Sequence, residues 1–134
     1  MKKTIVKGLH SPDIDLETYS PTEKDDFAFL LQVFVGMEGE QGDECFDMFV
    51  CTTKWIERNY SKQTILIGLH TMIVQEYNYE RIIRAVKELF CTEGISWDQI
   101  RCDLSYYGLS EMDYKHWSSY KNIVRCGIIK NSNP

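Results

Sequence analysis

Residues 27–57 read FAFLLQVFVGMEGEQGDECFDMFVCTTKWIE, in which two apolar runs flank a glycine-rich acidic turn. In the first run, apolar side chains occupy the alternating positions and also most of the positions between them. A strand that is apolar on both sides is typical of the interior of a sheet, with cover on each face. The second run, residues 45–51, places Phe46, Met48 and Val50 on one face of a strand. Three glycines permit a hairpin connection longer than a two-residue turn: Gly36, Gly39 and Gly42. The pattern predicts a core β-hairpin.

The turn of this predicted hairpin is acidic. It contains no basic residue and five acids: Glu38, Glu40, Asp43, Glu44 and Asp47. Residues 11–47 hold eleven acids against one base, Lys24, a formal charge of −10, while the rest of the chain carries +5 and the whole chain −5. Because phosphate binding needs clustered Lys and Arg, this asymmetry argues against a nucleic-acid partner and favours a basic protein partner. The alternative is a solvated acidic surface that binds nothing.

Length and composition indicate one globular domain, residues 1–134, with 43% hydrophobic and 26% charged residues. The N-terminus lacks the apolar region of a secretory signal, and no apolar run has the length of a membrane span. Five cysteines at irregular spacing argue against a disulfide framework. We therefore expect a cytoplasmic protein that does not contact a membrane.

Local patterns predict the elements around the hairpin. A strand is expected over residues 3–9, and a loop rich in Ser, Pro and Asp follows it over residues 10–24. Residues 54–59 are predicted to form a short helix capped by one of the two threonines before it, Thr52 or Thr53.

The second half of the chain is predicted to contain the two main helices. Residues 64–77 indicate one strand, or two strands broken at Gly68. Asn78 is a suitable N-cap for a helix whose apolar stripe contains Tyr79, Ile82, Val86, Leu89 and Phe90. Ser96 and Gln99 form a capping-box pattern that begins a helix running to about Tyr106.

The C-terminal part carries weaker patterns. Residues 111–117 are compatible with a short helical turn, and residues 120–129 with an edge strand or a tail. Residues 118–134 are interpreted as a C-terminal extension. The predicted fold class is α+β, a mostly antiparallel sheet of about four to five strands packed with two main helices.

Motifs of catalysis are missing from the sequence. No HExxH, GxSxG or glycine-rich phosphate loop is present, and the cysteines lack CxxC spacing. Asp13, Asp15 and Glu17 do not match the calcium-loop pattern. We expect no enzyme activity, no metal and no cofactor. Trp55 and Tyr77 lie near the strand-to-helix region, where aromatic residues are usually core and less often a binding patch.

Three segments of the chain resemble one known family. They read HSPDIDLETYSP, DDFAFLLQVFVGMEGEQGDECFDMFVCTTKWI and GLHTMIVQEYNYERI, and in this order and spacing they are similar to the immunity protein 8 family of bacterial polymorphic toxin systems. The resemblance covers roughly residues 4 to 107. It implies a non-catalytic α+β protein of the cytosol that binds the C-terminal domain of a cognate toxin and protects the producing cell.

The charge pattern supplies a candidate contact surface for such a toxin. Many toxins of these systems attack nucleic acid and have a basic cleft, which an acidic surface could occlude. The candidate toxin-binding residues are Asp13, Asp15, Glu38, Glu40, Asp43, Glu44, Trp55 and Tyr77. The competing hypothesis is a cytosolic adaptor or assembly protein that binds a host protein through a sheet edge or the aromatic patch.

Overall fold

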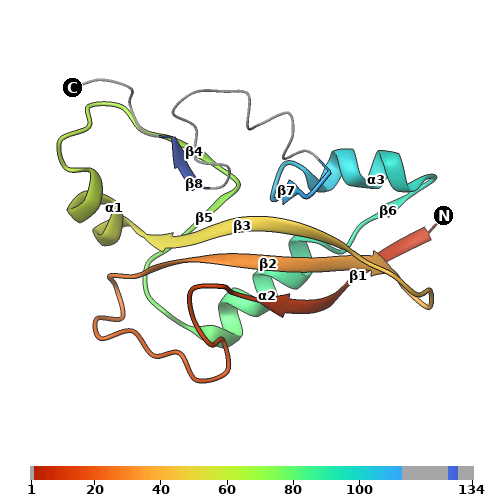
Figure 1. Cartoon of the computed structure of the whole chain (residues 1–134), viewed down its shortest axis with the longest axis horizontal. Helices are drawn as coiled ribbons and strands as arrows, with labels where there is room; N and C mark the ends of the chain where they lie inside the picture. The colour runs from red at the N-terminus through yellow and green to blue at the C-terminus, as the bar shows by residue number, and fades with distance from the viewer. Residues whose placement is uncertain (1, 113–126, 130–134) are drawn as a thin grey trace.

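The computed structural model describes residues 2–112 and 127–129 (Figure 1). In chain order the elements are β1 (Lys2–His10), β2 (Ala28–Met37), β3 (Glu44–Thr52), α1 (Thr53–Tyr60), β4 (Ile67–Leu69), β5 (Thr71–Val74), α2 (Tyr79–Leu89), β6 (Glu93–Gly94), α3 (Trp97–Leu104), β7 (Leu109–Ser110) and β8 (Gly127–Ile129). The α+β class and the central hairpin β2–β3 are confirmed.

The main sheet has the strand order β5-β3-β2-β1-β6, and β7 also pairs with β3. All its pairings are antiparallel except the one between β3 and β5. A parallel neighbour needs a crossover connection, and α1 and β4 lie in the chain between β3 and β5. The sheet is therefore mostly antiparallel, as predicted, and the one parallel pairing makes it mixed rather than purely antiparallel. A separate antiparallel pair joins β4 to β8.

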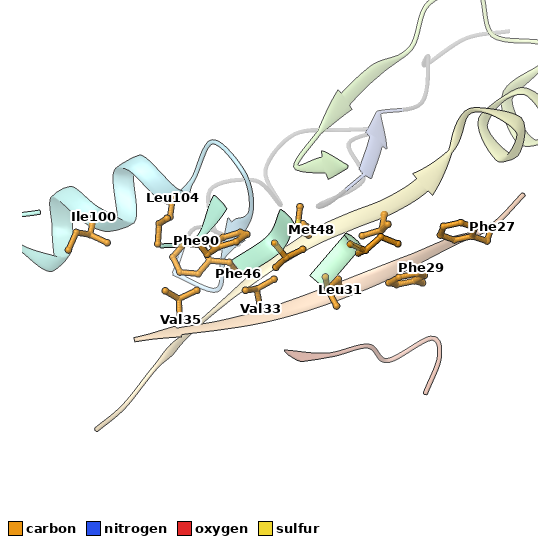
Figure 2. Close-up of a cluster of buried hydrophobic side chains, with 13 residues drawn as sticks. Phe27, Phe29, Leu31, Val33, Val35, Phe46, Met48, Phe90, Ile100 and Leu104 are labelled. Carbon is orange, nitrogen blue, oxygen red and sulfur yellow. The ribbon is translucent and has the colours of Figure 1, made fainter. Parts of the chain in front are cut away.

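The hydrophobic core lies on one face of the main sheet, under α2 and α3 (Figure 2). The alternating apolar side chains of β2, from Phe29 to Val35, are buried there together with Phe46 and Met48 of β3. The helices contribute five buried side chains to this core: Ile82, Val86, Phe90, Ile100 and Leu104. The opposite side of β2 is only half-buried at Leu30 and Phe34. The cover predicted on each face of β2 is therefore complete on the helix side and only partial on this side, because apolar side chains alone do not reveal which face a helix covers.

Several local predictions are confirmed at the level of single hydrogen bonds. Thr52, not Thr53, caps α1, since its hydroxyl accepts from the Trp55 backbone N–H at 3.2 Å. Asn78 caps α2 by accepting from the Arg81 N–H, and the Ser96 hydroxyl accepts from the Gln99 N–H at the start of α3.

Other local predictions need correction. The break in residues 64–77 falls at His70, whose φ is +48°, and not at Gly68. Tyr79 was placed on the buried stripe of α2 but is 42% exposed. α3 ends at Leu104 rather than near Tyr106. Of the predicted C-terminal elements, residues 127–129 form β8, while the helical turn at 111–117 and the start of the 120–129 strand lie outside the described residues.

Candidate functional site

The turn between β2 and β3 carries three exposed carboxylates, those of Glu38, Glu40 and Asp43, which we call the acidic tip. Two glycines shape the turn by adopting positive φ angles, Gly39 at +79° and Gly42 at +96°. The only ion pair that the tip forms within the described residues is between the Lys2 ammonium and the Glu40 carboxylate, at 3.3 Å, and both side chains are more than half exposed. Water screens such an exposed pair, so most of the negative charge of the tip remains available to a partner.

A cavity of about 250 Å³ lies beside the acidic tip, between the hairpin and α3. Its walls include Met37, Glu40 and Asp43 of the hairpin and the indole of Trp97. This hollow gives the tip one apolar wall next to its carboxylates.

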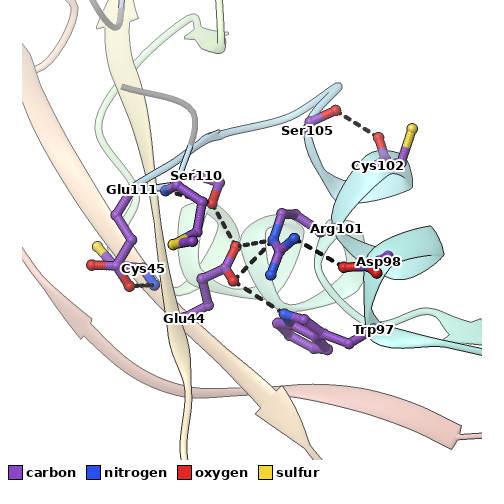
Figure 3. Close-up of polar contacts among 10 residues, drawn as sticks. Glu44, Cys45, Trp97, Asp98, Arg101, Cys102, Ser105, Ser110 and Glu111 are labelled. Carbon is purple, nitrogen blue, oxygen red and sulfur yellow. Dashed lines mark hydrogen bonds and ion pairs between the residues drawn. The ribbon is translucent and has the colours of Figure 1, made fainter. Parts of the chain in front are cut away.

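Glu44 differs from the tip residues because it is buried and bonded inside the protein (Figure 3). Its carboxylate accepts from the Arg101 Nε at 2.9 and 3.0 Å, from the Trp97 indole N–H at 3.1 Å and from the Ser110 hydroxyl. Burial by itself would raise the pKa of Glu44, but the hydrogen bonds from Arg101, Ser110 and Trp97 outweigh it and hold the pKa below its usual value. Glu44 therefore fastens the start of β3 to α3.

Asp13 and Asp15 lie in the loop between β1 and β2, where both carboxylates bind backbone N–H groups. Asp13 accepts from the Leu30 N–H at 2.8 Å, and Asp15 from the Glu17 N–H at 3.0 Å. Leu30 precedes Met37, at the tip end of β2, by seven residues, or about 23 Å at the rise of an extended strand. Figure 1 shows the loop and the hairpin turn at opposite ends of the sheet. The structure does not bring Asp13 and Asp15 together with the acidic tip.

The two aromatic candidates are half-buried and pack against other rings. Trp55 contacts Phe49 and Tyr60, with ring centroids 5.3 and 5.8 Å apart. Tyr77 makes edge contacts with Tyr19 at 5.2 Å and with Phe27 at 5.3 Å. These contacts support the core role of both residues.

Basic side chains of α1 pair with part of the acidic segment. The Arg58 guanidinium donates to both oxygens of Asp26, at 2.8 and 2.9 Å, and this hydrogen bonding holds the pKa of Asp26 below its usual value. Lys54 lies 3.6 Å from Asp25. The negative charge of residues 11–47 is thus partly compensated at both ends of the sheet, by Lys54 and Arg58 at the α1 end and by Lys2 at the tip end, and exposed acids remain at each end.

The sequence did not reveal the partners of Glu44. Trp97, Arg101 and Ser110 lie more than fifty positions away in the chain, and β7 brings Ser110 next to Phe46. A non-local pairing of this kind leaves no short-range pattern in the sequence. The sequence shows the acidic run around Glu44 but not the partners of Glu44.

The half-buried thiol of Cys45 and the buried thiol of Cys51, both on β3, are not poised for nucleophilic chemistry. Burial, with a smaller effect of the Asp47 charge, raises the pKa of Cys45 to about 12, and burial raises that of Cys51 to about 11. Both thiols are therefore un-ionised at neutral pH. Within residues 2–112 and 127–129, no three His, Cys, Asp or Glu side chains come together as metal ligands would.

Fold and site together are those of an α+β scaffold that displays an acidic turn, held in place by the ion pair of the buried Glu44 with Arg101. The family model for immunity protein 8 matches residues 4–114, well over half of the sequence. The chain therefore belongs to the immunity protein 8 family, a family of generally non-catalytic proteins that act in toxin systems. Searches of curated proteins and of solved structures gave no significant match. No helix in the described part of the chain is long and apolar enough to cross a membrane.

Proposed function

We propose that this chain binds the C-terminal domain of a cognate bacterial toxin in the cytoplasm and neutralises it by stoichiometric occlusion. The observation that carries this proposal is the family match over residues 4–114, which includes the whole hairpin and both main helices. The toxin surface that it covers is basic, as in a nuclease whose cleft binds phosphate groups.

The acidic tip supports a charged contact with such a partner. Glu38, Glu40 and Asp43 are exposed on a turn that two positive-φ glycines shape and that the Glu44–Arg101 pair ties to α3. Because Glu44 is buried and bonded to α3, the carboxylates of the tip are presented on an ordered base. Pre-organised charges raise the rate of association with an oppositely charged surface and select the partner.

Co-expression with the gene product encoded beside this chain tests the proposal. Induction of the neighbour alone should arrest growth, and co-expression of the chain should restore it. The two proteins should copurify in a 1:1 ratio, and rescue should require at least as many copies of the chain as of the toxin.

Two results would contradict this function. One is rescue by sub-stoichiometric amounts of the chain with a covalently altered toxin, which mass spectrometry would detect. The other is a harmless neighbour together with copurification of a host protein, which would support the adaptor hypothesis instead.

A further inference from the structure

The C-terminal ends of α2 and α3 border a cavity of about 380 Å³. Its lining residues include two acids, Glu88 and Asp103, and two tyrosines, Tyr106 and Tyr107. Among the residues that the structure describes, no Lys or Arg contributes to its wall. None of these four residues belongs to the acidic tip or to the candidate toxin-binding set.

The electrostatics of this cavity favour a cation. A helix C-terminus carries partial negative charge, so basic side chains are the stabilising choice there and carboxylates are unfavourable. Glu88 and Asp103 nevertheless lie in the last turns of α2 and α3, both are exposed, and neither forms an ion pair within the described residues. Of the bases in the same turns, Arg101 binds Glu44 and Asp98, and Lys87 lines a neighbouring hollow on α2 that includes Glu88 but not Asp103 or the two tyrosines.

The two tyrosines give the same cavity an aromatic surface. Tyr106 is 81% exposed and Tyr107 41% exposed. The Tyr107 ring packs edge-on against the buried Phe90 ring, with centroids 6.3 Å apart, so it is fixed to the core. The following residue, Gly108, approaches the core closely, since a Cβ there would lie 3.0 Å from the Cβ of Phe46. The Tyr107 ring is therefore fixed against the core, and the Tyr106 side chain before it is open to solvent.

We propose that this cavity receives the guanidinium group of an arginine from a protein partner. The identification of this partner as the toxin rests on the function proposed above. A planar guanidinium stacks on a phenol ring and donates to two carboxylates at once, which an ammonium does less well. The two helix C-termini add to the attraction. In this arrangement the acidic tip speeds the encounter, and the arginine in the α2–α3 cavity is an anchor of the complex.

NMR titration of the isolated protein with N-acetyl-arginine methylamide tests this binding site. Saturable shifts should appear at the amides of residues 88–92 and 103–107, and the uncharged N-acetyl-norleucine methylamide should leave them unchanged. The double variant Glu88→Gln with Asp103→Asn should lower the affinity for the arginine probe at least tenfold. The matched control, Glu17→Gln with Glu57→Gln, removes two exposed carboxylates elsewhere and should not change binding.

A second measurement separates this inference from the proposed function. The Tyr106 side chain is 81% exposed, so Tyr106→Ala should leave the thermal unfolding midpoint unchanged. The same variant should bind both the arginine probe and the toxin more weakly. If the arginine probe does not saturate, or if norleucine shifts the same amides, the anchor proposal is wrong even when toxin rescue succeeds. If the probe binds but the neighbouring gene product does not, the arginine-binding site is supported and the toxin is excluded as its partner.

Discussion

Glu40 and Glu44 lie four residues apart in the same hairpin, yet their side chains have opposite environments. The Glu40 side chain is 52% exposed and its ion pair with Lys2 is open to water. The Glu44 side chain is 9% exposed and accepts hydrogen bonds from three different side chains. An exposed pair contributes little to stability, whereas a buried carboxylate with all its partners in place contributes more and is damaging to disrupt.

Glu44→Gln should lower the free energy of unfolding at neutral pH by about 1–3 kcal/mol, the usual range for losing hydrogen bonds to a charged group. The folded-state pKa of Glu44 is lowered, so its stabilising effect is present above the pKa of the unfolded chain, about 4.3, and is lost as the pH falls through the lower folded-state value. Urea unfolding should therefore show a large difference between wild type and variant at neutral pH and a small difference in acid.

Asp98→Asn is the matched control for this variant. The Asp98 carboxylate also binds Arg101, at 3.2 Å, but its side chain is 92% exposed. The control should change the stability by less than about 0.5 kcal/mol. Equal losses for the two variants, or a Glu44→Gln effect that persists unchanged in acid, would contradict the account of the buried pair.

At the scale of elements, the sequence predicted those whose signals are local. The alternation of β2, the cap residues Asn78 and Ser96 and the stripe of α2 all lie within one element, so they could be read directly. The parallel pairing of β3 with β5 and the short strands β6 and β7 depend on residues brought from far away in the chain. Glu44 was assigned to the surface for the same reason, since its partners are in α3 and β7.

Thr52 joins two elements, which makes it a test of how β2 and α1 are connected. Its hydroxyl accepts from the Trp55 N–H of α1 and from the buried Phe27 N–H before β2, each at 3.2 Å. Thr52→Val keeps the shape of the side chain but leaves both donors without this acceptor, so it should destabilise the protein by about 1–3 kcal/mol in chemical denaturation. Thr53→Val, at the exposed neighbouring position, should have a much smaller effect. Similar losses at both positions would show that Thr52 is not the cap.

Gly94 controls how closely α3 packs on the edge of the sheet. A Cβ at this buried position would lie 2.5 Å from the Ile100 Cγ1, and Ile100 is fully buried, so α3 would have to move. We expect Gly94→Ala to lower the free energy of unfolding by about 1–3 kcal/mol, as overpacking does. Gly8→Ala is the control, because its nearest new contact would be 3.8 Å away, an ordinary packing distance. A Gly94→Ala protein as stable as Gly8→Ala would mean that α3 adjusts freely.

At the scale of the whole molecule, the negative charge is not distributed evenly. At one end of the sheet, Arg58 and Lys54 pair with Asp26 and Asp25. At the other end, Lys2 forms a solvent-screened pair with Glu40 of the acidic tip, and the Lys7 ammonium donates to the Glu40 carbonyl oxygen. A partner with a basic surface is therefore attracted by the local charge at either end of the sheet, which cannot be read from the net charge of −5.

Reversing the three tip acids should slow the association with the toxin. Glu38→Lys, Glu40→Lys and Asp43→Lys together change the formal net charge from −5 to +1. The association rate constant at low salt should fall at least tenfold, and its dependence on ionic strength should flatten, because electrostatic steering acts mainly on the encounter step. The measurement is stopped-flow or surface-based kinetics over a range of salt concentrations.

The control for the tip variant is Glu17→Lys with Glu23→Lys and Glu57→Lys, which makes the same change in net charge at exposed positions outside the tip. If steering depends on where the charge lies, this variant should retain most of the wild-type rate. Equal slowing by the two variants would attribute the effect to net charge, and unchanged kinetics in the tip variant would remove the tip from the encounter surface. Glu44 is left intact in both variants, because its replacement would unfasten β3 from α3 and mix a folding defect with a binding defect.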